Sequence, residues 1–238
     1  RLFAVDAKDG QPCKDFGDGG VVDITPLIEA ANPGNELTSV QSSSPPVIVK
    51  NTVVVGSTVG AKYRRSDAPS GAVRAFDART GKHLWSFDPL RPEGLDLQHQ
   101  EISQNNSLVG GANVWTLMSG DEAGDLIFLP TSSPSPNFFG GTRPGNNLFA
   151  NSIVALRAST GELVWYFQIV HHDVWDYDLP AQPIVTTINQ SGKLIPVVVQ
   201  LTKQGLIFVL HRDTGKPFFP IEERTVPTNG VPGEILSP

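Results

Sequence analysis

The feature that most constrains the fold is a short phrase that occurs four times along the chain. Its two complete copies read AFDARTGKHLW at residues 75–85 and ALRASTGELVW at residues 155–165. Partial copies lie at residues 4–10 and 209–218. Each copy joins strand-forming residues through a polar turn that ends in glycine, which is typical of a β-hairpin because glycine accepts a positive φ. We therefore expect four related hairpins, in which the closing Trp can pack on a neighbouring copy.

Self-similar β units at intervals of tens of residues are typical of a β-propeller, in which each blade is a four-stranded sheet. The chain also carries several strand-like apolar runs, whereas helical periodicity is scarce. We therefore predict an all-β chain with about four blades over residues 1–238. A β-sandwich whose hairpins are similar by coincidence is the alternative. The strand-like runs are residues 46–49, 52–55, 126–129, 195–199 and 206–210.

One short helix is expected at residues 25–31, with Thr25 as its N-cap and Pro26 at its first position. A propeller closes into a ring so that its sheet edges are protected. About four blades would leave that ring open, and the chain begins at Arg1 without a Met. We therefore interpret it as an internal piece of a longer protein whose propeller continues beyond both ends.

The charge and the cysteine content argue against several classes of protein. The net charge is −6, the sequence pI is about 5.3, and the Lys and Arg residues are scattered. This distribution argues against a nucleic-acid-binding surface and against a polybasic membrane anchor. Cys13 is the single cysteine, so no intrachain disulfide is expected. No apolar run approaches the ~18 residues that a membrane span needs.

The densest group of titratable residues is VHHDVWDYDLP, at residues 170–180. It connects two strand-like runs, and loops held on a rigid scaffold are where binding and catalytic groups concentrate. Asp176 has an aromatic residue on each side, which could partly exclude water from its carboxylate and make it a stronger base. The alternative is a polar turn whose aspartates only bond backbone groups. The density of titratable groups favours a functional loop with Asp176 as a general base.

Three more residues are candidates for binding. Trp115 follows Gly110 and Gly111, which could let a flat ligand approach the backbone and stack on the indole; a core Trp is the alternative. Ser135 lies in a proline-rich loop, where its hydroxyl could bind a hard cation or simply the backbone. Lys203 follows a buried strand run, so its ammonium could reach a central channel; a surface lysine is the alternative. A cation near a general base suits a redox site whose acceptor gains negative charge.

Two blocks of sequence resemble the pyrroloquinoline quinone (PQQ)-dependent dehydrogenases, most closely the branch of membrane-bound glucose dehydrogenase and quinate dehydrogenase. The first block runs from Asn151 to Pro183 and contains HHDVWD followed by LPAQP. The second block contains TKQG at residues 202–205 and ends with VPGE at residues 231–234. The PAQP ending separates this branch from the methanol and ethanol dehydrogenases. The resemblance extends over essentially the whole chain.

The resemblance implies an eight-bladed propeller with PQQ and a divalent cation, Ca²⁺ or Mg²⁺, in its central funnel. By position, Asp176 resembles the catalytic base that takes the proton of the substrate hydroxyl. Lys203 resembles the residue that hydrogen-bonds the quinone oxygens and stabilises the reduced form. Trp115 resembles the Trp that stacks on the PQQ plane, and Ser135 falls where the branch has a hydroxyl near the cofactor and metal.

One stretch departs from the pattern of this branch. After a Gly-Ser such as Gly56-Ser57, the branch carries an Asp-Asn pair associated with the metal site. Here the chain reads TVGAKY, which ends in Lys62 and Tyr63 and contains neither residue. The metal ligands therefore stay open: either another blade supplies them or Lys62 takes the place of the cation.

The function implied is PQQ-dependent oxidation of an alcohol or polyol, with an aldose such as glucose as the leading substrate and a quinate-type polyol acid as another. The resemblance also implies a periplasmic location, a quinone acceptor such as ubiquinone, and a membrane anchor outside this chain. One alternative is a non-catalytic scaffold like the outer-membrane assembly lipoproteins. Such a scaffold needs the hairpins but not the block at residues 171–183 or Lys203. Another is a dehydrogenase that has lost its metal.

Overall fold

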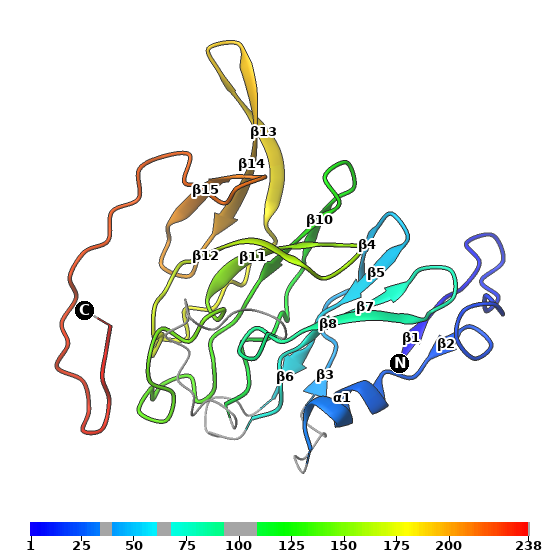
Figure 1. The fold of residues 1–238 in the computed structure, drawn as a ribbon, viewed down its shortest axis with the longest axis horizontal. Coiled ribbons are helices and arrows are strands. Elements are labelled where there is room, and N and C mark those ends of the chain that lie inside the picture. The colour runs from blue at the N-terminus through cyan, green and yellow to red at the C-terminus, as the bar shows by residue number, and fades with distance from the viewer. Residues whose placement is uncertain (34–39, 61–67, 93–108, 238) are drawn as a thin grey trace.

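The computed structural model describes residues 1–33, 40–60, 68–92 and 109–237. Its described strands form two four-stranded sheets, one three-stranded sheet and two two-stranded sheets. All strand pairs within these sheets are antiparallel. The sheets follow one another from the N-terminal, blue end of the chain at the right of Figure 1 to the orange strands at the upper left.

In both four-stranded sheets the strands neighbour one another in chain order, except that β6 (Thr58–Val59) is inserted between β5 and β7 of the first sheet and pairs elsewhere; this is the arrangement of a propeller blade. The first contains β4 (Val47–Val49), β5 (Thr52–Val55), β7 (Val73–Asp77) and β8 (His83–Phe87), and the second contains β9 (Ser119–Asp121), β10 (Leu126–Pro130), β11 (Ser152–Arg157) and β12 (Leu163–Gln168).

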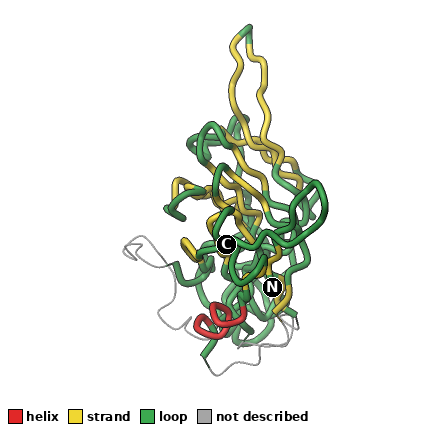
Figure 2. Tube along the Cα trace, turned by 90° about the vertical axis from the view of Figure 1, so that its right-hand side faces the viewer, coloured by secondary structure: helices red, strands yellow, loops and turns green. Residues whose placement is uncertain are grey.

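The three-stranded sheet comes next along the chain, and its first two strands extend beyond the other sheets as a long hairpin (Figures 1 and 2). The two small sheets lie near the N-terminal end. The third sheet contains β13 (Ile184–Gln190), β14 (Lys193–Leu201) and β15 (Ile207–His211), and the small ones pair β1 (Leu2–Phe3) with β2 (Val21–Val22) and β3 (Val40–Gln41) with β6 (Thr58–Val59).

All four copies of the repeat form hairpins, as predicted. The two complete copies are the pairs β7–β8 and β11–β12. The first partial copy is closed by a bridge between Val5 and Pro12, and the last by a bridge between Leu210 and Pro217. The predicted strand runs are also confirmed within a few residues. The all-β propeller expected from the repeat is therefore the observed architecture.

Each complete copy docks its Trp on the turn of the next copy. The indole Nε1 of Trp85 donates to the carbonyl oxygen of Ala158 at 2.9 Å, and a Cβ at Gly161 would lie 2.7 Å from the ring of Trp85. Trp165 repeats this contact one sheet further along: its Nε1 donates to a backbone carbonyl at 2.8 Å, and a Cβ at Gly215 would lie 2.5 Å from its ring. The glycine of each turn therefore makes room for the indole that ties neighbouring sheets together.

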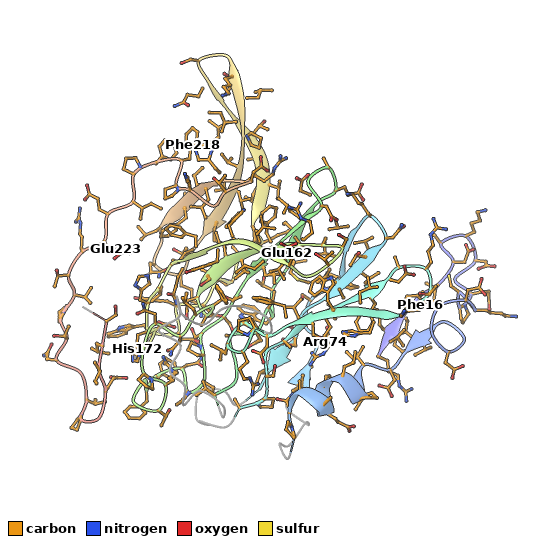
Figure 3. The ribbon with its side chains drawn as sticks, in the orientation of Figure 1. Phe16, Arg74, Glu162, His172, Phe218 and Glu223 are labelled. Carbon is orange, nitrogen blue, oxygen red and sulfur yellow. The ribbon has the colours of Figure 1, made fainter. Side chains whose placement is uncertain are left out.

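Strand β10 shows how neighbouring sheets share their cores, through the side chains that fill the space between the ribbons in Figure 3. All five of its residues are buried, and successive side chains point to opposite faces. Ile127 and Leu129 pack with β5 and β7 on one side, whereas Leu126 and Phe128 pack with β14 and β15 on the other. Because both faces of this strand are covered, its residues form a continuous apolar run in the sequence.

The predicted helix is present as α1 (Thr25–Ala31), but the expected cap is wrong. The helix begins at Thr25 and its N-cap is Ile24, which makes no side-chain capping bond. Instead, the carboxylate of Asp23 accepts a hydrogen bond from the N–H of Thr25 at 3.0 Å, so the acidic side chain two residues earlier binds the first N–H of the helix. Within the described ranges, no helix has the length and hydropathy of a membrane span.

The Trp–Gly contact can be tested by adding one methyl group to two glycines. Gly161 and Gly192 both have a positive φ, 77° and 85°, but a Cβ at Gly192 would meet nothing within 4 Å. Gly192→Ala should therefore cost only the strain of an L residue in the left-handed region, about 1 kcal/mol. Gly161→Ala should cost about 1–3 kcal/mol more, because its methyl group overpacks the ring of Trp85. Denaturant unfolding of both variants measures the difference, and equal costs would contradict the docking.

Candidate functional site

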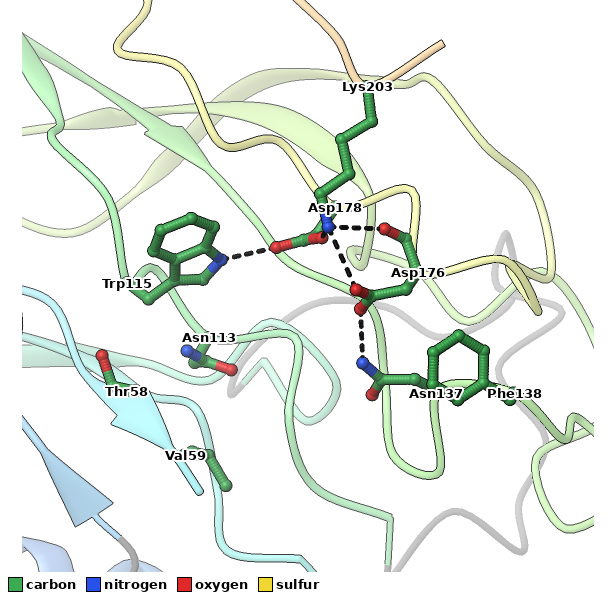
Figure 4. Close-up of a pocket in the computed structure, with 9 residues that line it drawn as sticks. All are labelled: Thr58, Val59, Asn113, Trp115, Asn137, Phe138, Asp176, Asp178 and Lys203. Atoms are coloured by element: carbon green, nitrogen blue, oxygen red, sulfur yellow. Dashed lines mark hydrogen bonds and ion pairs between the residues drawn. The ribbon is translucent and has the colours of Figure 1, made fainter. Parts of the chain in front are cut away.

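Connections from three successive sheets line a cavity of about 440 Å³ (Figure 4). Because the strands alternate in direction, these connections all leave the sheets at one end, opposite to the glycine turns of the repeats. The described residues that line the cavity are Thr58 and Val59 of β6, Asn113 and Trp115 before β9, Asn137 and Phe138 between β10 and β11, Asp176 and Asp178 between β12 and β13, and Lys203 between β14 and β15.

Lys203 lies at the centre of the polar groups of this cavity. Its Nζ donates to Oδ2 of Asp176 at 3.1 Å and to the backbone oxygen of Asp176 at 2.7 Å. It also donates to Oδ1 of Asp178, whose side chain is only 4% exposed. A buried carboxylate is costly without a cation, so Lys203 compensates Asp178 in particular. These contacts hold the ammonium of Lys203 against the loop at residues 170–180; its position in a central channel stays a prediction.

The same contacts decide the protonation of Lys203. Burial alone would lower the pKa of its ammonium. The hydrogen bonds and charges of Asp178 and Asp176 outweigh burial, so the pKa of Lys203 is raised above its usual value. Lys203 therefore stays a cation throughout the neutral range.

Asp176 is oriented from two sides. Oδ1 accepts a hydrogen bond from Nδ2 of Asn137 at 2.5 Å, and Oδ2 faces Lys203. Its backbone has a φ of 59°, in the left-handed region that few non-glycine residues adopt. Trp175 was expected to help keep water from this carboxylate, but it is 70% exposed and does not cover it. Asn137 and Lys203 are therefore the described side chains that bond to the carboxylate of Asp176.

Trp115 is joined to Lys203 through one carboxylate. Its indole Nε1 donates to Oδ2 of Asp178 at 2.6 Å, while Oδ1 of Asp178 accepts from Lys203. The preceding glycines do not leave space for a ligand as expected. A Cβ at Gly110 would lie 1.9 Å from the backbone oxygen of Ala68, so this glycine is required by the close approach of the chain itself.

Among the predicted site residues that the structure describes, Ser135 is the one that does not line the cavity. It is fully buried and its N–H donates to the oxygen of Gly110 at 3.0 Å, whereas Asn137, two residues later, lies in the cavity wall. The contact of Ser135 with a cofactor or metal therefore stays a prediction. Lys62 and Tyr63 lie outside the described residues. The part of the chain that is described contains no group of three or more His, Cys, Asp or Glu residues that could hold a metal ion.

Sequence reasoning missed three of the polar residues in the cavity wall. Asp178 belongs to the loop that was singled out, and its spacing of two from Asp176 was the available signal. Asn137 follows the proline-rich stretch, and Asn113 precedes Trp115, but nothing in the local pattern distinguishes them. Asn113 is held in place by its own bonds, donating to the oxygen of Ser57 at 2.7 Å and accepting from Ser132 at 2.9 Å.

The whole chain, residues 1–238, matches the family described as "PQQ: Glucose/ethanol/alcohol dehydrogenase, beta-propeller domain". Among curated proteins, it is 40% identical to the glycerol dehydrogenase large subunit of Gluconobacter oxydans (strain 621H), with 100% of the chain and 31% of the relative covered. It is 35% identical to the quinoprotein glucose dehydrogenase of Escherichia coli (strain K12), with 100% and 29% covered. The quinate/shikimate dehydrogenase (quinone) of Acinetobacter baylyi is 38% identical, again with 100% and 29% covered. The chain thus spans about 30% of the length of these relatives.

Two solved structures of dehydrogenases are also similar to this chain. The quinohemoprotein alcohol dehydrogenase ADHIIG from Pseudomonas putida HK5 superposes with a TM-score of 0.70 at 27% identity, covering 92% of this chain and 32% of that one. A europium-containing methanol dehydrogenase superposes with a TM-score of 0.66 at 28% identity, covering 79% of this chain and 36% of that one. These similarities are consistent with the stacked four-stranded sheets described above.

The ion pairs of Lys203 predict a stability difference that depends on pH. Lys203→Met should lower the free energy of unfolding by about 2 kcal/mol near neutral pH, because it leaves Asp178 buried without a cation. The pKa of Lys203 is raised on folding, so its stabilisation is fully present below the unfolded value of about 10.4. It is lost as the pH rises through the higher folded value.

Urea unfolding of both proteins at pH 8 and at pH 11 or above measures this difference. Lys193→Met, which replaces an exposed lysine of the β13–β14 hairpin, is the control and should change stability by less than about 0.5 kcal/mol. A difference between wild type and Lys203→Met that stays constant into strong alkali would contradict the ion pairs.

Proposed function

Since the chain belongs to the PQQ-dependent glucose, ethanol and alcohol dehydrogenase family, we propose that the protein oxidises an alcohol or polyol with PQQ as its electron acceptor. The observation that carries this proposal is the convergence of Asp176, Lys203 and Trp115 on one cavity, although they come from different inter-strand connections. A carboxylate, an ammonium and a flat aromatic face are the groups that such a reaction needs from the protein.

The described residues fit a planar quinone that carries carboxylates. The cavity volume lies within the roughly 300–1,000 Å³ that is usual for small-molecule sites. Trp115 supplies an aromatic face, and Lys203 supplies an ammonium that can bond quinone oxygens. The amide oxygen of Asn137 is buried and has no hydrogen-bond partner among the described residues, although the residue lies in the cavity wall. A buried acceptor of this kind is satisfied when a bound ligand or water supplies a donor.

The contacts of each residue support the role that we propose for it. PQQ, when bound, supplies the two-electron acceptor for the carbon that bears the substrate hydroxyl. Asp176 takes the proton of that hydroxyl; Asn137 fixes the direction of the carboxylate through Oδ1, and Lys203 donates a hydrogen bond to Oδ2. With the cofactor in this cavity, the ammonium of Lys203 would stabilise the negative charge that the acceptor gains. Asp178 keeps Lys203 and the indole of Trp115 in fixed positions.

A divalent cation, Ca²⁺ or Mg²⁺, is part of the proposal. Lys203 is the only cation in the described lining, and it already faces two carboxylates. An anionic cofactor in the same cavity requires further positive charge, which an oxygen-ligated divalent cation would supply.

The substrate that we propose is an aldose such as glucose. Relatives named for glycerol, glucose and quinate match the chain at similar identity, so glycerol and a quinate-type polyol acid are the competing substrates. We further propose a periplasmic location and ubiquinone as the final acceptor, which rests on the resemblance to the membrane-bound branch of the family.

The proposal predicts that Asp176→Asn abolishes turnover. The full-length protein is loaded with PQQ and Ca²⁺ or Mg²⁺, and dye reduction is measured with glucose, glycerol, quinate and ethanol. The amide cannot accept the hydroxyl proton, so kcat should fall by about 10²–10⁴-fold while PQQ affinity changes by less than about threefold. Asp213→Asn, at a mostly exposed aspartate of a repeat turn, is the control and should behave as the wild type.

Two results would count against this assignment. If Asp176→Asn kept the wild-type rate, or if it lost PQQ binding while staying folded, Asp176 would not be the base. If the wild-type protein folded but neither bound PQQ nor reduced the dye, the non-catalytic scaffold would be the better interpretation.

A further inference from the structure

The proposed mechanism makes no use of Asp173, although it is the most deeply buried carboxylate of the loop at residues 170–180. The residue is 1% exposed. Its carboxylate accepts four hydrogen bonds, which is close to the full capacity of the group. The donors are the N–H of Trp175 at 3.0 Å, the N–H of Tyr177 at 2.9 Å, Oγ of Ser133 at 2.5 Å and Nδ2 of Asn151 at 3.1 Å.

Two of these bonds hold the backbone on either side of Asp176, the proposed base. The N–H groups of Trp175 and Tyr177 belong to the residues immediately before and after Asp176, and they bind different oxygens of the Asp173 carboxylate. Asp176 itself has a positive φ, which costs free energy for a non-glycine residue and persists only where its surroundings hold it. The carboxylate of Asp173 therefore fixes the backbone on both sides of a strained position.

The hydrogen bond from Ser133 connects Asp173 to the loop that contains Asn137, the residue that orients the base. Ser133 lies in the connection that leads to Asn137, whose amide holds Oδ1 of Asp176. Arg143 reinforces the same link: its guanidinium is fully buried and donates to the backbone oxygens of Pro136, Asn137 and Asp173. Burial lowers the pKa of Arg143 to about 10, with Asp173 acting against that shift, so Arg143 stays charged at neutral pH. Asp173 and Arg143 thus tie together the two connections that hold Asp176.

We propose that Asp173 is a positioning residue, which acts through Asp176 by holding its carboxylate at a fixed place in the cavity. This proposal rests on the proposed function, in which Asp176 is the base. Asp173 does not line the cavity, so it has no contact with a substrate there. Its effect on the reaction is the effect of misplacing Asp176, and misplacement of a reacting group by about 1 Å can cost about 10²-fold in rate.

Asp173→Asn is the direct test. Whichever way the new amide turns, its NH₂ group faces at least one N–H donor, so one anchoring bond is replaced by a repulsive contact. Ser133→Ala removes a single bond to Asp173 and is a milder variant in case Asp173→Asn does not fold. Asp125→Asn is the matched control, because Asp125 also has a positive φ and a carboxylate that accepts from a hydroxyl, that of Ser159 at 2.5 Å, but lies in the β9–β10 turn.

The first readout is independent of activity. Hydrogen–deuterium exchange of the full-length protein should show the amides of residues 175–177 exchanging about tenfold faster or more in Asp173→Asn, and faster to a smaller extent in Ser133→Ala. The control should leave these amides unchanged. Protection of residues 175–177 that is unaltered in a folded Asp173→Asn protein would overturn the proposal.

The second readout is kinetic, on the protein loaded with PQQ and Ca²⁺ or Mg²⁺. Asp173→Asn should lower kcat by about 10- to 100-fold while the PQQ dissociation constant changes by less than about threefold. In an Asp176→Ala background, adding Asp173→Asn should change the residual rate by less than about twofold, because the residue through which it acts is gone. An equal loss in both backgrounds would overturn the proposal.

The two readouts also separate this proposal from the proposed function. If the wild-type protein showed no PQQ-dependent turnover, the proposed function would fail. The exchange of residues 175–177 would then decide by itself whether Asp173 holds Asp176 in place.

Discussion

The contact between an indole and the glycine of the next repeat is the constraint on which the rest of the structure depends. Each of these contacts joins one sheet to the following sheet, through an indole N–H bond of 2.8–2.9 Å and a ring that fills the space a side chain would take. A sheet with both faces covered cannot shift along its neighbour without breaking this contact. The relative position of the sheets is therefore fixed at the end of the molecule opposite to the cavity.

The cavity depends on that fixed position because no single sheet contains it. Lys203 comes from the third sheet, Asp176 and Asp178 from the connection that enters it, and Trp115 from the connection before the second. Distances of 2.6–3.1 Å among these groups require the sheets to be held to within a fraction of an ångström. The ammonium of Lys203 in turn stabilises the buried carboxylate of Asp178, which would be costly to bury without a cation. Packing at one end and electrostatics at the other thus stabilise the same arrangement.

Much of this arrangement could be predicted from the sequence, because the informative patterns are local. A turn that ends in glycine and a Trp four residues later are enough to indicate the hairpins and their docking, and apolar runs locate the strands. The resemblance to a known family selected Asp176, Lys203 and Trp115, and these three residues do meet.

What the sequence does not contain is the direction of each side chain in the long connections. Ser135 and Asn137 are two residues apart in one proline-rich stretch, yet Asn137 lies in the cavity wall and Ser135 does not. Trp175 was expected to shield Asp176 and instead points largely into solvent. The role of Asp173 depends on four donors that are up to 40 residues away along the chain, so only the folded structure brings them together.

The most direct test of the central claim is the binding of PQQ to the full-length protein, measured by equilibrium dialysis for the wild type, Lys203→Met and Trp115→Ala. If the cavity holds the quinone between this ammonium and this indole, both variants should bind PQQ about tenfold more weakly or worse while remaining folded. Folded variants that bind PQQ with the affinity of the wild type would show that the cofactor lies elsewhere, and the account of this site would be wrong.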